Sequence, residues 1–324
     1  MVRKFLSFFL FLFLFFPIQG FAFGDSDGQK VQIRLIAELE TIQPGQPFYV
    51  AIEQTITPNW HNYWKNPGDS GLPTTIKWDL PSGAKAGPII WPTPNRYKTG
   101  DLTNYGYSKE VLLLTEITPP DTLLPGSVLE LSADVDWLAC EEICIPESGQ
   151  ASLSIPVTDQ AGGLSQSASK FEQTRKNIPT EINISAKTEI HDDGMVLIID
   201  PISDLTDQSI REAYFYNDDG VSVPHAAPQK MKQVDGALHL ILENGDRFLK
   251  EGDLLTGDLA ITTDDCRKSF TIAAEAFVPL FQIAEKDPLA NDFLADEQGS
   301  TTLWTAILFA FLGGLALNLM PCVF

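Results

Sequence analysis

Two cysteines, Cys140 and Cys144, lie close together in a chain that has only four cysteines. Two thiols this near can open and close a disulfide on a partner protein, which a solitary thiol cannot do. The attacking species in such exchange is a thiolate, and the reaction proceeds through a mixed disulfide. The pair is therefore a candidate for thiol–disulfide chemistry.

The local conformation decides whether this pair can form a bridge. In an extended strand the two Cα atoms would lie roughly 13 Å apart, whereas a disulfide needs a separation below about 7 Å. The pair must therefore lie on a turn, or on a single helical turn that stacks positions i and i+4 at about 6 Å. Strained or exposed disulfides are the labile ones, and a ring this small is easily strained.

Two other interpretations of the pair stay open. The bridge can be a purely structural staple. Alternatively, two thiolates together with the imidazole of His61 would suit Cu(I), which would make the region a periplasmic copper-binding, copper-tolerance module. Glu141 and Glu142 disfavour a thiolate if they lie close in space, which favours a reductant or relay over a strong oxidant. No phosphate loop, nucleotide fingerprint or Ser–His–Asp arrangement is present, and the sequence predicts no cofactor and no bound metal.

The two ends of the sequence have different membrane signals. Residues 1–24 combine a basic start, an apolar run at 5–16 and small residues near a cleavage position, which predicts a secretory signal peptide. Residues 300–324 carry no charge and are long enough to span a bilayer, so we expect the first transmembrane helix there, truncated at Phe324. The sequence is thus interpreted as a fragment of a longer, exported membrane protein.

The net charge limits the choice of partners. The formal charge is −21 at pH 7. Nucleic acid and anionic lipid surfaces are therefore poor partners.

The exported part is predicted to contain two β-sandwich domains. Residues 25–158 and 181–284 both consist of short apolar or alternating runs separated by proline and glycine. Residues 159–180 form a small-residue linker with a short helix, and residues 285–299 form an acidic tether to the membrane. The first domain holds the cysteine pair and every tryptophan outside the apolar end, so the site is expected there. Cys266, in the second domain, has no obvious partner.

Three stretches of sequence resemble one family. The segment VDWLACEEICIPESG (residues 135–149) resembles the periplasmic N-terminal domain of thiol:disulfide interchange reductases of the DsbD type, and it is most similar to their ScsB-like branch. The segment NWHNYWKNPGDSGLP (residues 59–73) also resembles the ScsB-like branch. The end, LNLMPCVF (residues 317–324), is similar to the start of the family's electron-carrying membrane domain.

The resemblance implies a fold and a reaction. The fold class would be all-β, with two immunoglobulin-like β-sandwich domains followed by the start of an α-helical membrane domain. The catalytic residues would be Cys140, Cys144 and Cys322, and the enzyme would be a protein-disulfide reductase. Electrons would pass from cytoplasmic thioredoxin through the protein's own membrane domain to a periplasmic thioredoxin-like disulfide protein. Residues 25–299 would lie in the periplasm and the rest in the bacterial inner membrane.

The resemblance also implies a shield for the cysteines. The family covers them with a cap loop that contains aromatic residues, and DLTNYGYS (residues 101–108) resembles that loop. It includes Asp101, and it would place Tyr105 and Tyr107 over the disulfide. The founding members separate the two cysteines by more residues than this chain does, so a facing-strand geometry and the order of attack do not follow from the resemblance.

Overall fold

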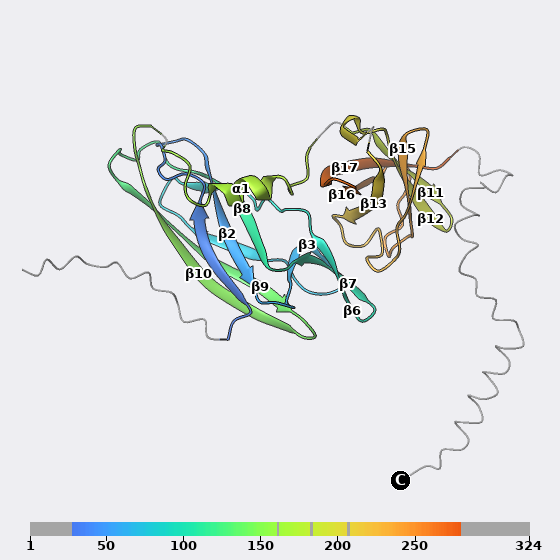
Figure 1. Ribbon diagram of the computed structural model, residues 1–324, viewed down its shortest axis with the longest axis horizontal. Coiled ribbons are helices and arrows are strands. Elements are labelled where there is room, and N and C mark those ends of the chain that lie inside the picture. The colour runs from blue at the N-terminus through green and yellow to red at the C-terminus, as the bar shows by residue number, and fades with distance from the viewer. Residues whose placement is uncertain (1–27, 161, 182–183, 206–207, 280–324) are drawn as a thin grey trace, which may run out of the picture.

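The computed structural model describes residues 28–160, 162–181, 184–205 and 208–279. Over these residues the chain is built almost entirely of β-strands, in two bodies joined by a segment with one short helix (Figure 1). The predicted all-β, immunoglobulin-like sandwich class is confirmed for this part of the chain. The predicted signal peptide, acidic tether and transmembrane helix lie outside the described residues.

The first domain is a sandwich of two main sheets with a smaller third sheet at one end. Sheet orders are β1-β2-β8-β5, β10-β9-β4 and β3-β7-β6. The strands are β1 (Val31–Ala37), β2 (Phe48–Ile56), β3 (Asn62–Gly68), β4 (Thr75–Asp79), β5 (Lys85–Ala86), β6 (Asn95–Thr99), β7 (Leu102–Tyr107), β8 (Glu110–Thr118), β9 (Val128–Cys140) and β10 (Cys144–Pro156).

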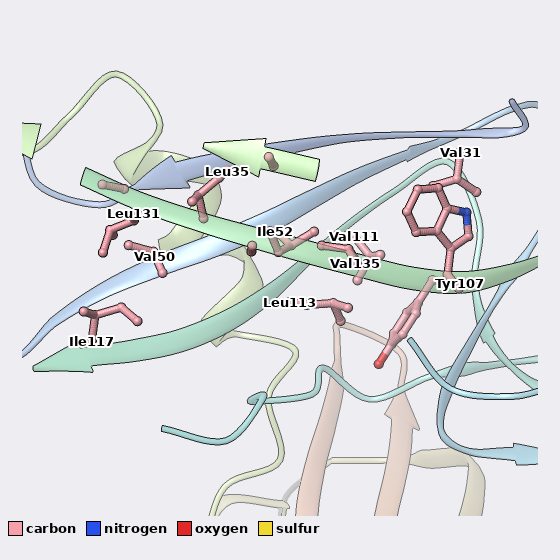
Figure 2. Packing of buried hydrophobic residues seen from close by; sticks show 14 of the residues in the cluster. Val31, Leu35, Val50, Ile52, Tyr107, Val111, Leu113, Ile117, Leu131 and Val135 are labelled. Atoms are coloured by element: carbon pink, nitrogen blue, oxygen red, sulfur yellow. The ribbon is translucent and has the colours of Figure 1, made fainter. Parts of the chain in front are cut away.

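Alternating side chains explain how the two main sheets pack. In β9, residues from Leu129 to Ala139 at odd positions are buried, and the even positions between them are exposed or half-buried. This period of two is that of a strand with one face on a core. Figure 2 shows side chains from both sheets meeting there, including Ile52, Leu113 and Val135.

A short helix covers one side of this sandwich. Helix α1 (Ala168–Arg175) lies against β8 and buries Phe171 completely (Figure 1). Lys170 on the same helix forms ion pairs with Glu53 and Glu110. These contacts attach the connecting segment to the first domain before the chain enters the second.

The second domain is a single seven-stranded sheet around its own apolar core. Its order is β13-β16-β17-β11-β12-β15-β14, with one parallel pair between β11 and β17. The antiparallel pair β14–β15 is joined by a tight turn at Asp235 and Gly236, both with positive φ. The strands are β11 (Ala186–His191), β12 (Gly194–Ile199), β13 (Ile210–Asn217), β14 (Lys230–Val234), β15 (Ala237–Leu242), β16 (Leu254–Thr263) and β17 (Arg267–Phe277).

Candidate functional site

The cysteine pair closes the end of the long hairpin formed by β9 and β10. Cys140 and Cys144 are direct register partners and form a disulfide, with their Cα atoms 4.2 Å apart. The loop between them holds only Glu141, Glu142 and Ile143. Of the two conformations left open by the spacing, the structure has the turn, and it places the cysteines on facing strands.

The two sulfurs have very different surroundings. Both cysteines belong to the even-numbered, outward face of the hairpin. Cys144 is exposed there, whereas Cys140 has only 2% of its surface exposed because β3 covers it. A partner thiol or disulfide therefore has access to the sulfur of Cys144 and not to that of Cys140.

His61 joins β3 to the disulfide through the backbone. Its N–H donates to the Cys140 carbonyl at 2.9 Å, and the Cys140 N–H donates to the His61 carbonyl at 2.8 Å. Both backbone groups of Cys140 thus point toward His61 and away from Cys144. The Cys140–Cys144 pair consequently occupies a non-hydrogen-bonded position, where facing residues come closest.

Tyr63, two residues further along β3, contacts both sulfurs. Its hydroxyl donates to Cys140 Sγ at 2.8 Å and lies 3.2 Å from Cys144 Sγ. Burial raises the pKa of Tyr63, and the neighbouring Ser70 has a smaller opposite effect, so the hydroxyl keeps its proton at neutral pH. Tyr63 is therefore a fixed hydrogen-bond donor to the reacting atoms.

A glycine makes room for this tyrosine. Gly71 has φ +95°, a conformation that favours glycine, and a Cβ at this position would overlap the Tyr63 ring. Ser70, beside it, donates to Asn104 Oδ1 at 2.9 Å, and its hydroxyl lies close to Tyr63. The chain that follows β3 thus folds back and packs on the tyrosine ring.

The predicted cap residues lie elsewhere. Residues 102–107 are strand β7, in which Gly106 faces Tyr63 and Tyr107 faces Asn62. Because side chains alternate along a strand, Tyr105 and Tyr107 point to the side opposite Tyr63. The Tyr105 hydroxyl bonds that of Tyr214 at 2.8 Å, and the Tyr107 hydroxyl donates to the Pro92 carbonyl.

The third predicted cap residue, Asp101, is exposed in the turn between β6 and β7. The aromatic residue in contact with the disulfide is Tyr63, which sequence analysis left without a role. The signal that could have identified it is the alternation of His61 and Tyr63 inside a segment already assigned to the family's ScsB-like branch.

The His61 ring packs among aromatic residues. It stacks on Tyr97 with ring centroids 4.8 Å apart and meets Tyr63 edge-on at 5.4 Å. Burial lowers the pKa of His61, which keeps the ring neutral. In the part of the chain that the structure describes, no group of three or more His, Cys, Asp or Glu side chains is arranged to hold a metal ion.

The tip of the hairpin is acidic and carries one apolar side chain. Glu141 and Glu142 are exposed, and Ile143 has 67% of its surface exposed. A protein that docks at Cys144 would therefore contact these side chains as well.

Cys266 is not part of this site. Cys266 is a free, half-buried thiol in the second domain, 3.7 Å from Thr263 Oγ1. Cys322 lies outside the described residues. Within the described ranges, no helix is long and apolar enough to cross a membrane.

Comparison with known proteins connects this geometry with a family. Residues 32–156 match the family described as thiol:disulfide interchange protein DsbD, N-terminal. Among solved structures, the N-terminal periplasmic domain of ScsB from Proteus mirabilis superposes with a TM-score of 0.55 at 16% identity, over 77% of this chain and 95% of that one. The major pilin subunit BcpA of Bacillus cereus gives a TM-score of only 0.20 at 9% identity, over 77% of this chain and 68% of that one. No curated protein matches the chain.

Proposed function

Since residues 32–156 form a DsbD N-terminal domain, whose disulfide Cys140–Cys144 serves thiol–disulfide exchange, we propose that this pair is an electron relay. It takes two electrons from a membrane cysteine pair that contains Cys322 and passes them to periplasmic thioredoxin-like proteins. The protein's own membrane domain, anchored in the bacterial inner membrane, receives those electrons from cytoplasmic thioredoxin. The exported region is then a protein-disulfide reductase.

The main support for this proposal is the unequal exposure of the two cysteines. Of the two cysteines only Cys144 is exposed, so Cys144 is the one that meets the partner. Cys140 is 2% exposed and is reached only from Cys144 or through movement of β3. A structural staple would not need one open sulfur and one sulfur held by a tyrosine hydroxyl.

The positions of the two sulfurs define the order of steps by which the pair reduces a disulfide in a partner protein, the client. In the reduced domain the Cys144 thiolate attacks one sulfur of the client disulfide, and the other client sulfur leaves as a thiolate. The sulfur of Cys140, as thiolate, then attacks Cys144 Sγ, forms the Cys140–Cys144 disulfide and releases the second client thiolate. The client gains two electrons from the domain and takes up two protons from water, and the domain loses two electrons and releases two protons to water.

Tyr63 acts on the buried sulfur in both directions of this reaction. Its hydroxyl lies 2.8 Å from Cys140 Sγ, where it donates to a thiolate more strongly than to a disulfide sulfur. Cys140 is surrounded by protein and cannot draw this stabilisation from bulk water. The tyrosine therefore lowers the free energy of the thiolate when the disulfide opens.

Trapping the mixed disulfide tests this assignment. The reduced full chain, purified in mild detergent, is mixed with oxidised glutathione and then with an oxidised thioredoxin-fold protein. The Cys140→Ala variant should accumulate an adduct at Cys144, while Cys144→Ala should form far less adduct at Cys140. Equal trapping at both sulfurs would contradict the proposed order, and no trapping at either would contradict the relay itself.

A further inference from the structure

The second domain contacts the first domain directly beside the redox site. The Tyr105 hydroxyl bonds that of Tyr214, and the Trp64 ring meets Tyr216 edge-on at a centroid distance of 5.8 Å. Tyr214 and Tyr216 pack into the same apolar core as residues of the first domain. Trp64 is the immediate neighbour of Tyr63, so the interface begins one residue away from the side chain that contacts both sulfurs.

A short loop lies between this interface and Tyr63. We call residues 68–71, the end of β3 and the turn after it, the support loop. On one side Ser70 and Gly71 pack on Tyr63. On the other side Asp69 Oδ1 lies 2.9 Å from Nδ1 of His225, which belongs to the second domain. The loop thus touches the redox site and the second domain at adjacent residues.

Asn66 provides a second connection across the same interface. Its Nδ2 donates to the carbonyl of Asn217 at 2.6 Å, while its Oδ1 accepts from the N–H of Gly68 at 3.0 Å. One side chain therefore bonds a strand of the second domain and the first residue of the support loop. The Nε2 atom of His225 lies 3.4 Å from the same Asn66 amide.

These contacts are shielded from water. His225 is 7% exposed and Asn66 is 6% exposed. Hydrogen bonds in such surroundings are stronger than on the surface, and breaking one leaves a buried polar atom without a partner. The position of the support loop is therefore sensitive to the loss of a single partner.

The first domain alone holds only part of the loop. The Asp69 N–H donates to the Thr103 carbonyl at 3.0 Å, and Asp69 Oδ2 accepts from the Thr103 N–H at 2.7 Å. These bonds tie Asp69 to β7. Asp69 Oδ1 and Asn66 Nδ2 are bonded instead by the second domain, through His225 and the Asn217 carbonyl.

We propose that the second domain is a positioning element of the redox site, in which His225 and Asn217 hold Asp69 and Asn66 and thereby fix the support loop against Tyr63. This inference rests on the proposed exchange function of Cys140 and Cys144. Docking of the second domain holds the Tyr63 hydroxyl on Cys140 Sγ, and loosening of that docking slows the opening of the disulfide. His225 is a positioning residue, because it acts on the sulfurs only through Asp69 and Tyr63.

Substitutions on the second domain test this without touching the first. In the full chain, His225→Ala removes the partner of Asp69, and His225→Asn restores a donor near the position of Nδ1. Glu212→Ala is the matched control, since Glu212 pairs with Arg96 across the same interface and has no contact with the support loop. Two readouts are used: the rate at which dithiothreitol opens Cys140–Cys144, and the equilibrium constant of the pair with glutathione.

We expect His225→Ala to open about tenfold more slowly and to shift the equilibrium constant at least threefold, where a full tenfold shift is about 30 mV for a two-electron couple. His225→Asn should recover most of the rate, and Glu212→Ala should stay within twofold of the unsubstituted chain. If His225→Ala perturbs the second domain, as judged by circular dichroism, Asp69→Ala removes the same contact from the first domain.

Two results would overturn the inference without affecting the proposed function. If His225→Ala and Asp69→Ala both stay within twofold of the unsubstituted chain, the second domain does not position the site. If Glu212→Ala changes both readouts as much as His225→Ala, the effect comes from general docking and not from the support loop. A disulfide in the unsubstituted chain that glutathione does not open would overturn the proposed function as well.

Discussion

The hydroxyl of Tyr63 lies 2.8 Å from the Sγ atom of Cys140, at the point where β3 covers the end of the β9–β10 hairpin. Tyr63 and Cys140 are far apart in sequence, and the backbone pair His61–Cys140 brings their strands together. The consequence is a disulfide with one sulfur under a fixed donor and the other sulfur exposed. This asymmetry gives the two cysteines different chemistry although they share one bond.

Removal of the Tyr63 hydroxyl should slow the opening of the disulfide. Tyr63→Phe keeps the ring but loses a hydrogen bond that would reach a thiolate, and such bonds contribute about 1.5–3 kcal/mol. We expect opening by dithiothreitol to slow by at least about tenfold, the factor that corresponds to about 1.4 kcal/mol. Tyr97→Phe is the control, because the Tyr97 hydroxyl bonds Ser108. Equal rates for Tyr63→Phe and the unsubstituted chain would remove Tyr63 from the mechanism.

A methyl group at Gly71 should displace Tyr63. Gly71→Ala adds a Cβ that overlaps the ring, at a φ of +95°. Gly100→Ala is matched to it, since Gly100 also has positive φ, +62°, but open space around it. We expect Gly100→Ala to cost about 1–2 kcal/mol from backbone conformation alone, and Gly71→Ala to cost more and to slow disulfide opening. Urea denaturation measures the stability of each variant, and the dithiothreitol assay measures the rate of disulfide opening. If disulfide opening slowed in Gly100→Ala and not in Gly71→Ala, the expectation would be contradicted.

The carboxyl of Asp258 should make the stability pH-dependent. Asp258 is 2% exposed on β16; burial raises its pKa from 3.8 to about 6, with Lys65 acting against the shift and Asp218 adding to it. The folded chain thus binds this proton more tightly than the unfolded chain does. The stabilisation is fully present below about pH 4 and is lost as the pH rises through about 6, by an amount on the order of 3 kcal/mol.

Asp258→Asn should abolish this contribution. At pH 7 the substitution removes a buried charge, while Lys65 keeps its 2.7 Å ion pair with Asp218. We therefore expect the variant to gain stability relative to the unsubstituted chain between pH 4 and pH 7, as measured by urea denaturation at several pH values. Asp218→Asn, which changes a more exposed partner, should retain most of the pH dependence. A constant difference between Asp258→Asn and the unsubstituted chain at all pH values would contradict the assignment.

The long hairpin and the core were largely predictable from local patterns. Among the short apolar or alternating runs of residues 25–158, those at 31–39, 48–55 and 111–117 correspond to β1, β2 and β8, because alternation and β-branched residues mark them. β9 extends from Val128 to Cys140, beyond the apolar run at 128–135, because it pairs with β10 and then with His61. Such extension depends on partners that are distant in sequence.

The sheet that completes the site was not predictable in this way. β3, with the sequence NYWKNPG, mixes aromatic, polar and turn residues and includes an irregularity between Tyr63 and Gly68, so it has no clean period. Residues 101–108 resemble a cap loop with tyrosines over the disulfide, but most of them form β7, whose tyrosines face the second domain. Which face of β7 lies near the cysteines depends on the pairing of Tyr63 with Gly106, and no local pattern specifies that pairing.

The reduction potential of the Cys140–Cys144 pair tests the central claim most directly. The full chain is equilibrated in glutathione buffers, and alkylation of the peptides that contain Cys140 and Cys144 is counted by mass, apart from Cys266 and Cys322. An electron relay predicts a potential between about −180 and −270 mV, the range of exchange proteins. A potential below about −300 mV would identify a structural staple and contradict the account.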